Sequence, residues 1–170
     1  MGEGTFEVER RYLVRVSEAF RGALGEGWHL RQGYVTSGST SVRIRVGEPR
    51  GPVLTCKSGS GVRRREVEAA VSPAMAEALF AAAGERVIEK VRHPLGCWEL
   101  DRFGGGLEGL VLLEIELDSE DDAIPEAPYG LEIMREVTDD NRFTSSGLAC
   151  MTREDQQRFV QAVYAEAGAC

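Results

Sequence analysis

Apolar and polar residues alternate along most of the chain, and short turn-forming segments separate the alternating runs. A period of two is typical of β-strands, whose successive side chains point to opposite faces. The alternation predicts strands over residues 6–16, 34–35, 41–46, 53–57, 62–71, 87–92, 97–103 and 110–117. Because Gly- and Ser-rich turns join most of these runs, we expect the strands to pair antiparallel.

A few helices are expected between and after the strands. Ser72 followed by Pro73 is a helix-start signal and predicts a helix over residues 74–83 that ends at Gly84. Thr152 begins a segment, residues 152–167, whose apolar residues recur at helical spacing. Shorter helices are expected near residues 17–24 and 139–148. About eight antiparallel strands with few helices indicate an α+β domain or a closed β-barrel.

Charged side chains gather on one face of six successive strands. The sets that share a face are Glu7, Glu9 and Arg11; Arg43 and Arg45; Arg64, Glu66 and Glu68; Lys90 and Arg92; Glu99 and Asp101; and Glu114 and Glu116. On a single strand, a solvated face is the simpler interpretation. Like charges two residues apart repel each other, however, and a surface gains nothing from keeping them. The repetition favours a charged interior in which basic residues hold an oligophosphate and carboxylates hold divalent cations.

Composition and charge narrow the class of protein. A length of 170 residues predicts one domain, and no run of 18 apolar residues indicates a transmembrane helix. No signal peptide is recognisable, so we expect a cytoplasmic protein whose four scattered cysteines are reduced thiols and form no zinc site. The net charge of -8 argues against non-specific binding to nucleic acid or membranes. The total hides how the charges are sorted along the strands.

The ordered set of motifs resembles one known family. Glu7-x-Glu9-x-Arg11 resembles the ExExK signature of the CYTH superfamily, the triphosphate tunnel metalloenzymes, which also contains inorganic triphosphatases. The resemblance covers about residues 5–150 and continues, in order, at residues 30–34, 42–45, 54–57, 64–68, 89–92, 98–101, 113–117 and 136–149. It implies an eight-stranded antiparallel closed β-barrel whose charged lumen binds a triphosphate and a divalent metal ion.

The resemblance also implies a role for each matching residue. The implied metal ligands, for Mg²⁺ or Mn²⁺, are Glu7, Glu9, Glu66, Glu68, Asp101, Glu114 and Glu116. The implied triphosphate-binding residues are Arg11, Arg43, Arg45, Lys57, Arg64, Lys90 and Arg92, with Arg142 closing or orienting the site. The implied catalytic residues are Glu9, Arg11 and Tyr34. Metal-dependent hydrolysis of a triphosphate, with inorganic tripolyphosphate as the expected substrate, is the implied activity.

Arg11 stands where the family signature has lysine. Arginine stays charged and cannot exchange a proton near neutral pH, although it can still hold phosphate with two hydrogen bonds. Alternation places its neighbour Arg10 on the opposite face of the strand. Arg11 in place of lysine keeps open a non-catalytic triphosphate- or polyphosphate-binding module. Class IV adenylyl cyclase-like and thiamine triphosphatase-like activities are separate alternatives that also stay open. We expect the helix over residues 152–167 to pack on the barrel or cap one mouth, and a homodimer contact stays open.

Overall fold

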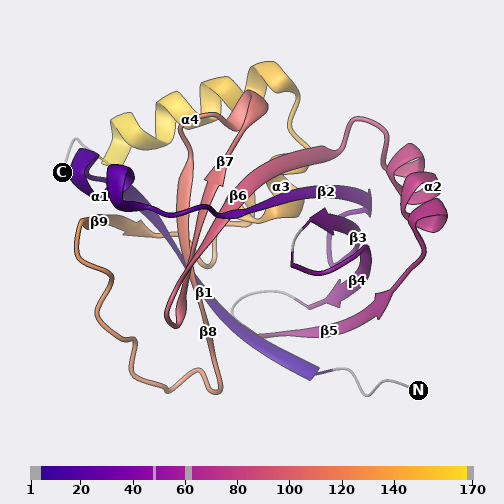
Figure 1. The fold of residues 1–170 in the computed structure, drawn as a ribbon, viewed down its shortest axis with the longest axis horizontal. Helices are drawn as coiled ribbons and strands as arrows, with labels where there is room; N and C mark the ends of the chain where they lie inside the picture. Colours follow the sequence, from indigo (N-terminus) through magenta and orange to yellow (C-terminus); the bar gives the residue numbers. More distant parts are fainter. Residues whose placement is uncertain (1–4, 48, 60–62, 168–170) are drawn as a thin grey trace.

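A single antiparallel sheet organises the computed structural model, which describes residues 5–47, 49–59 and 63–167 (Figure 1). Its nine strands are β1 (Thr5–Val16), β2 (Trp28–Thr36), β3 (Thr40–Gly47), β4 (Val53–Ser58), β5 (Arg63–Ala70), β6 (Val87–Leu95), β7 (Trp98–Phe103), β8 (Val111–Leu117) and β9 (Leu131–Glu136). The strands follow the order β5-β4-β3-β2-β6-β7-β8-β1-β9. With a few helices around the sheet, the architecture is α+β, as predicted.

The long strand β1 has three partners. Its middle pairs with β8, and its last residues, from Tyr12 onward, pair with β9 with a register shift between Leu13 and Val14. Its first residues pair with β5, from Thr5 opposite Glu66 to Val8 opposite Arg63. Strand β5 therefore pairs with β4 along one edge and with β1 along the other, and the closed eight-stranded barrel stays a prediction.

The helices begin and end at the signals that the sequence carries. They are α1 (Glu18–Ala23), α2 (Pro73–Ala83), α3 (Ser145–Ala149) and α4 (Arg153–Ala167), with the 3-10 turns η1 (Gly105–Leu107) and η2 (Asn141–Phe143). Ser72 caps α2 by accepting a hydrogen bond from the Met75 amide, and Gly84 ends it with a φ of 62°. The predicted helix near residues 139–148 is wrong as one element. Extended backbone at Thr144 (ψ 146°) divides it into η2 and α3.

Most strands of the sheet have an apolar side and a side that points toward the charged residues, and the latter side is here called the charged face. Trp98, Leu100 and Leu113 belong to a cluster on the opposite face, against which Phe20 of α1 packs. The charged face is itself apolar at one end, where Leu112 lies two residues from Glu114 and joins a second cluster. Helix α4 covers that end, and its Tyr164 hydroxyl donates to the Val14 carbonyl at 3.0 Å. The apolar end confines the charged side chains to the rest of the face.

Among the described strands, β9 is the one that the alternation missed entirely, and of β2 it predicted residues 34–35 alone. The adjacent apolar residues Ile133 and Met134 of β9 break the period of two, and Ile133 is exposed. Among the described residues the strand pairs with β1 alone, and more than 100 residues separate the two strands along the chain. Within the described ranges, no helix is both long and apolar enough to cross a membrane. The cytoplasmic location, the single domain and the homodimer contact stay predictions.

Candidate functional site

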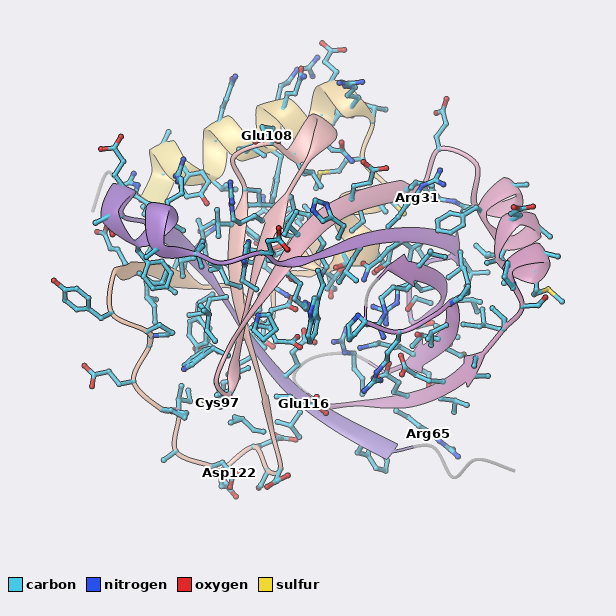
Figure 2. The ribbon with its side chains drawn as sticks, viewed as in Figure 1. Arg31, Arg65, Cys97, Glu108, Glu116 and Asp122 are labelled. Atoms are coloured by element: carbon cyan, nitrogen blue, oxygen red, sulfur yellow. The ribbon has the colours of Figure 1, made fainter. Side chains whose placement is uncertain are left out.

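A cavity of about 400 Å³ opens on the charged face of the sheet. Its cationic lining residues are Arg11, Arg43, Arg45, Arg50, Lys57, Arg64, Lys90 and Arg92. Its carboxylate lining residues are Glu9, Glu66, Glu68, Glu99, Glu114 and Glu116. In Figure 2, side chains with nitrogen and oxygen tips gather inside the curl of β2, β3, β4 and β5. The described lining therefore holds eight cations against six anions, although the whole chain has a net charge of -8.

Most of the predicted site residues meet at this cavity. The predicted residues that line it are Glu9, Arg11, Tyr34, Arg43, Arg45, Lys57, Arg64, Glu66, Glu68, Lys90, Arg92, Glu114 and Glu116. Neighbouring strands in register bring them together, as at β1 and β8, where Glu9 lies opposite Glu116 and Arg11 opposite Glu114. The side chain of Glu7 lies outside the described residues.

Arg11 lies buried between two carboxylates. Its Nη2 donates to Glu9, and its Nε donates to Oε1 of Glu114 at 2.6 Å. Burial alone would lower the pKa of Arg11, but the charges of Glu9 and Glu114 outweigh it and raise that pKa. Burial alone would likewise raise the pKa of Glu114, yet Arg11, Lys90 and Arg92 hold it well below 4.5. Both groups therefore stay charged at neutral pH.

A second group of ion pairs lies on β6, β7 and β8. Arg92 donates to both oxygens of Asp101 at 2.7 and 2.6 Å and to Oε2 of Glu114 at 2.7 Å. Lys90 donates to Asp101, which is 0% exposed. Burial and the Arg92 charge lower the pKa of Lys90, while Asp101 and Glu114 oppose that change. Asp101 was predicted as a cavity carboxylate, but it is absent from the lining and instead pairs with the two cations beside it.

The third group connects β3, β4 and β5. Arg43 donates to the Thr55 hydroxyl at 3.1 Å, and that hydroxyl donates to Glu68 at 2.8 Å. Lys57 Nζ lies 3.3 Å from an oxygen of Glu66. Burial raises the pKa of Glu68, but the hydrogen bond from Thr55 and the nearby arginines lower it overall. Thr55 is a residue that the sequence interpretation missed, although it lies two residues from Lys57 and so shares its face.

Gln32, on the side of β2 that faces the cavity, is another residue that the sequence interpretation missed. The buried Tyr34 hydroxyl donates to Oε1 of Gln32 at 3.3 Å, and both side chains line the cavity. The other lining residues that were not predicted include Trp28, Leu30, Ser41, Arg50, Thr144, Ser145 and Ser146. Period-two spacing from Tyr34 and Arg43 could have found those on β2 and β3. No charge pattern marks the serine and threonine residues near α3.

Three arginines lie away from the cavity. Arg142 was predicted to close or orient the site, but it is absent from the lining, and its half-exposed side chain pairs with Asp140 at 2.6 Å. The hydrogen bond to Asp140 therefore holds Arg142 on η2. Arg10 pairs with Glu136 of β9 at 3.1 Å, which confirms that it faces away from Arg11. Figure 2 shows Arg65 on the outer side of β5, also pointing away.

A second cavity of about 440 Å³ adjoins the first. Both are lined by Glu9, Arg11, Lys57 and Arg64. The rest of the second lining includes the turn after β2 and small polar residues of the tail, such as Asn141. The shared residues lie where the two cavities meet, so the charged space extends from one to the other.

The carboxylates of the cavity supply the oxygen atoms that Mg²⁺ and Mn²⁺ prefer. Among the side chains described, no group of three or more His, Cys, Asp or Glu is placed to hold a metal ion. Mg²⁺ is commonly bound by one or two carboxylates together with substrate phosphates. Glu9 and Glu116, opposite each other in register, fit that mode of binding.

Several similar proteins carry the same name, inorganic triphosphatase. An inorganic triphosphatase of Nitrosomonas europaea is 36% identical over 152 residues, covering 84% of this chain and 96% of the relative. An inorganic triphosphatase of Acetivibrio thermocellus is 34% identical over 148 residues, covering 84% of this chain and 92% of the relative. A crystal structure of an inorganic triphosphatase matches with a TM-score of 0.57 and 33% identity, covering 89% of this chain and 99% of that one. No family model matches the chain.

Proposed function

The chain belongs to the inorganic triphosphatase family, and we propose that it hydrolyses inorganic tripolyphosphate in its charged cavity. This is the family that the ExExK-like resemblance indicated, so that prediction is confirmed. In the proposed reaction a water oxygen bonds to the terminal phosphorus while the bond to the bridging oxygen breaks. The products are phosphate and pyrophosphate.

The excess of cations on the cavity wall is the observation that carries the proposal. Eight Arg and Lys side chains and six carboxylates make up the described lining, and Asp101 behind it pairs with Lys90 and Arg92, so eight cations still stand against seven anions. Guanidinium groups hold phosphate oxygens with two parallel hydrogen bonds, and ammonium groups hold them as point charges. A linear polyanion is the ligand that such a wall complements.

The basic residues would contact the substrate from two sides of the cavity. Arg43, Arg45 and Lys57 come from β3 and β4, where Thr55 and the β5 carboxylates hold them. Arg64 and Arg92 come from β5 and β6. Because these groups are already oriented by their partners, little side-chain freedom is lost when phosphate replaces a carboxylate.

We further propose that the cavity is a tunnel through a closed β-barrel. The pairing of β1 with β5 joins the ends of the order of eight strands, with β9 as an addition on β1, and this supports closure. The two adjoining cavities and their shared residues also support a passage that a linear triphosphate enters lengthwise. Closure would hold the polyanion among cations on all sides and exclude bulk water, which strengthens each ionic contact.

We assign Mg²⁺ or Mn²⁺ first to Glu9 and Glu116, with Glu66, Glu68 and Glu114 as further carboxylates on the same cavity. A bound divalent ion would supply Lewis-acid stabilisation of the charge on the phosphoryl group. Arg11 stays charged, so its part is to stabilise negative charge on the phosphate without moving a proton. Tyr34, fixed by Gln32, would orient a phosphate oxygen.

Phosphate release tests the proposal. The protein, supplied with Mg²⁺ or Mn²⁺, should release phosphate from tripolyphosphate faster than from ATP or thiamine triphosphate. Tight binding without turnover would favour the non-catalytic module, and cyclic AMP formation from ATP would favour a cyclase; either result overturns the proposal.

Two adjacent arginines supply a matched pair of variants. Arg64→Ala removes a lining cation, and kcat/KM should fall by about tenfold or more, which is the effect of losing one charged hydrogen bond. Arg65→Ala removes the same charge from the outer side of β5 and should leave kcat/KM unchanged. Equal losses in the two variants would contradict the assignment of the cavity.

A further inference from the structure

Arg11 joins two strands through a single guanidinium group. It lies two residues from Glu9 on the charged face of β1, and it lies opposite Glu114 on β8. Different nitrogens reach the two carboxylates, since Nη2 donates to Glu9 and Nε donates to Glu114 at 2.6 Å. All three side chains are largely buried. The planar fork of arginine makes this bridge, and a single ammonium group has no such fork.

Other cations complete the neutralisation of these carboxylates. The second oxygen of Glu114 accepts from Nη2 of Arg92 at 2.7 Å. Glu9 also lies 3.3 Å from Nη2 of Arg64. Among the described residues, each carboxylate is therefore held by at least two guanidinium groups. A divalent cation that approaches Glu9 and Glu114 must displace at least one of these groups or be repelled by it.

We propose that Arg11 acts as a built-in cation for Glu9 and Glu114, and that a divalent metal ion engages this pair only after a triphosphate has drawn the guanidinium away. Phosphate oxygens accept the same two-pronged hydrogen bonds as carboxylates, so a bound triphosphate competes for Arg11. Metal and triphosphate then favour each other's binding by the same factor. The role of the triphosphate rests on the proposed function, whereas the exclusion of metal does not.

Binding of Mn²⁺ alone tests the exclusion. Free Mn²⁺ is measured by its electron paramagnetic resonance signal, with no triphosphate present. Arg11→Gln should bind Mn²⁺ about tenfold or more tightly than the wild type, since it removes the competing charge. Arg10→Gln is the matched control, because Arg10 is the next residue and also pairs with a glutamate, but on the opposite face. It should bind Mn²⁺ like the wild type.

Each outcome of the Mn²⁺ measurement either supports or overturns the claim that Arg11 keeps metal away from Glu9 and Glu114. Wild-type binding as tight as that of Arg11→Gln would overturn it, and so would an equal gain in Arg10→Gln. If Arg11→Gln fails to fold, Arg11→Lys replaces it, because an ammonium group cannot bridge both carboxylates. Arg11→Lys should then gain Mn²⁺ affinity, and no gain would overturn the proposal.

The displacement of Arg11 by a triphosphate is tested by nuclear magnetic resonance with tripolyphosphate, in the presence of EDTA to remove metal ions. The Arg11 Nε–H resonance is assigned by its loss in Arg11→Gln, and it should shift when tripolyphosphate is added. A resonance that stays in place while tripolyphosphate binds would overturn the displacement step. A protein that excludes Mn²⁺ through Arg11 but never hydrolyses tripolyphosphate would refute the proposed function and leave the exclusion standing.

Discussion

Replacing Asp101 by asparagine tests the buried ion pairs beside the cavity. Asp101 is 0% exposed and accepts hydrogen bonds from Lys90 and from two nitrogens of Arg92. Asp101→Asn keeps the shape of the side chain but removes its charge. The buried Lys90 ammonium group then loses its hydrogen-bonded carboxylate and lies beside the like charge of Arg92, although Glu114 is still nearby.

The expected loss is large for one substitution. Removing one partner of a buried ion pair costs about 3–5 kcal/mol, because the other charge stays buried without compensation. For a chain of this length, a loss of 1 kcal/mol lowers Tm by about 2–4 °C, so Asp101→Asn should lower Tm by about 6–20 °C. Adding Lys90→Met to this variant should restore part of the loss, since it removes the buried ammonium group that has lost its hydrogen-bonded carboxylate.

Thermal and urea unfolding followed by circular dichroism measure these losses. The control is Glu89→Gln, because Glu89 pairs with Arg31 at the surface, 3.8 Å apart, with both side chains more than half exposed. That variant should lose at most about 1 kcal/mol. A loss in Asp101→Asn no larger than in the control would refute the reasoning, because it would mean that the Asp101 charge is compensated by solvent.

Three further predictions concern other parts of the molecule. Tyr164→Phe removes a hydroxyl that bridges backbone atoms of β1 and β8, and should cost about 1–3 kcal/mol in urea unfolding; an unchanged midpoint would contradict this. Glu114, with its pKa held well below the ordinary 4.5, stabilises the fold above that pH and loses this contribution as the pH falls through its folded pKa. Stability should therefore fall more steeply below about pH 4.5 in the wild type than in Glu114→Gln, and parallel pH profiles would count against it. Thr55→Val breaks the link between Arg43 and Glu68 and should raise KM for tripolyphosphate about tenfold, with recovery in Thr55→Ser; equal KM values would show that the link has no effect on binding.

Much of the sheet could be predicted because most strands face two unlike environments. On β8, Leu113 and Ile115 pack in an apolar cluster, while Glu114 lines the charged cavity, so the sequence alternates in step with the structure. Strand β9 lacks this contrast. Its Ile133 is exposed and its pairing with β1 is set by distant residues, so no local pattern marks it.

The candidate site could be predicted in composition but not in its pairings. Charged residues two apart on a strand must share a face, so Arg43 and Arg45, and the similar pairs on other strands, could be assigned to one face from the sequence. Spacing does not show which acid each base takes as its partner. Asp101 pairs below the cavity with Lys90 and Arg92, and Arg142 pairs with Asp140, because three-dimensional proximity decides these contacts.

Phosphorus nuclear magnetic resonance tests the central claim most directly. Tripolyphosphate is incubated with the wild-type protein and Mg²⁺, and its signals are followed with time. The account predicts that they give way to phosphate and pyrophosphate in equal amounts, and that Arg64→Ala slows this change while Arg65→Ala does not. A tripolyphosphate spectrum that stays unchanged with the wild-type protein would contradict the account.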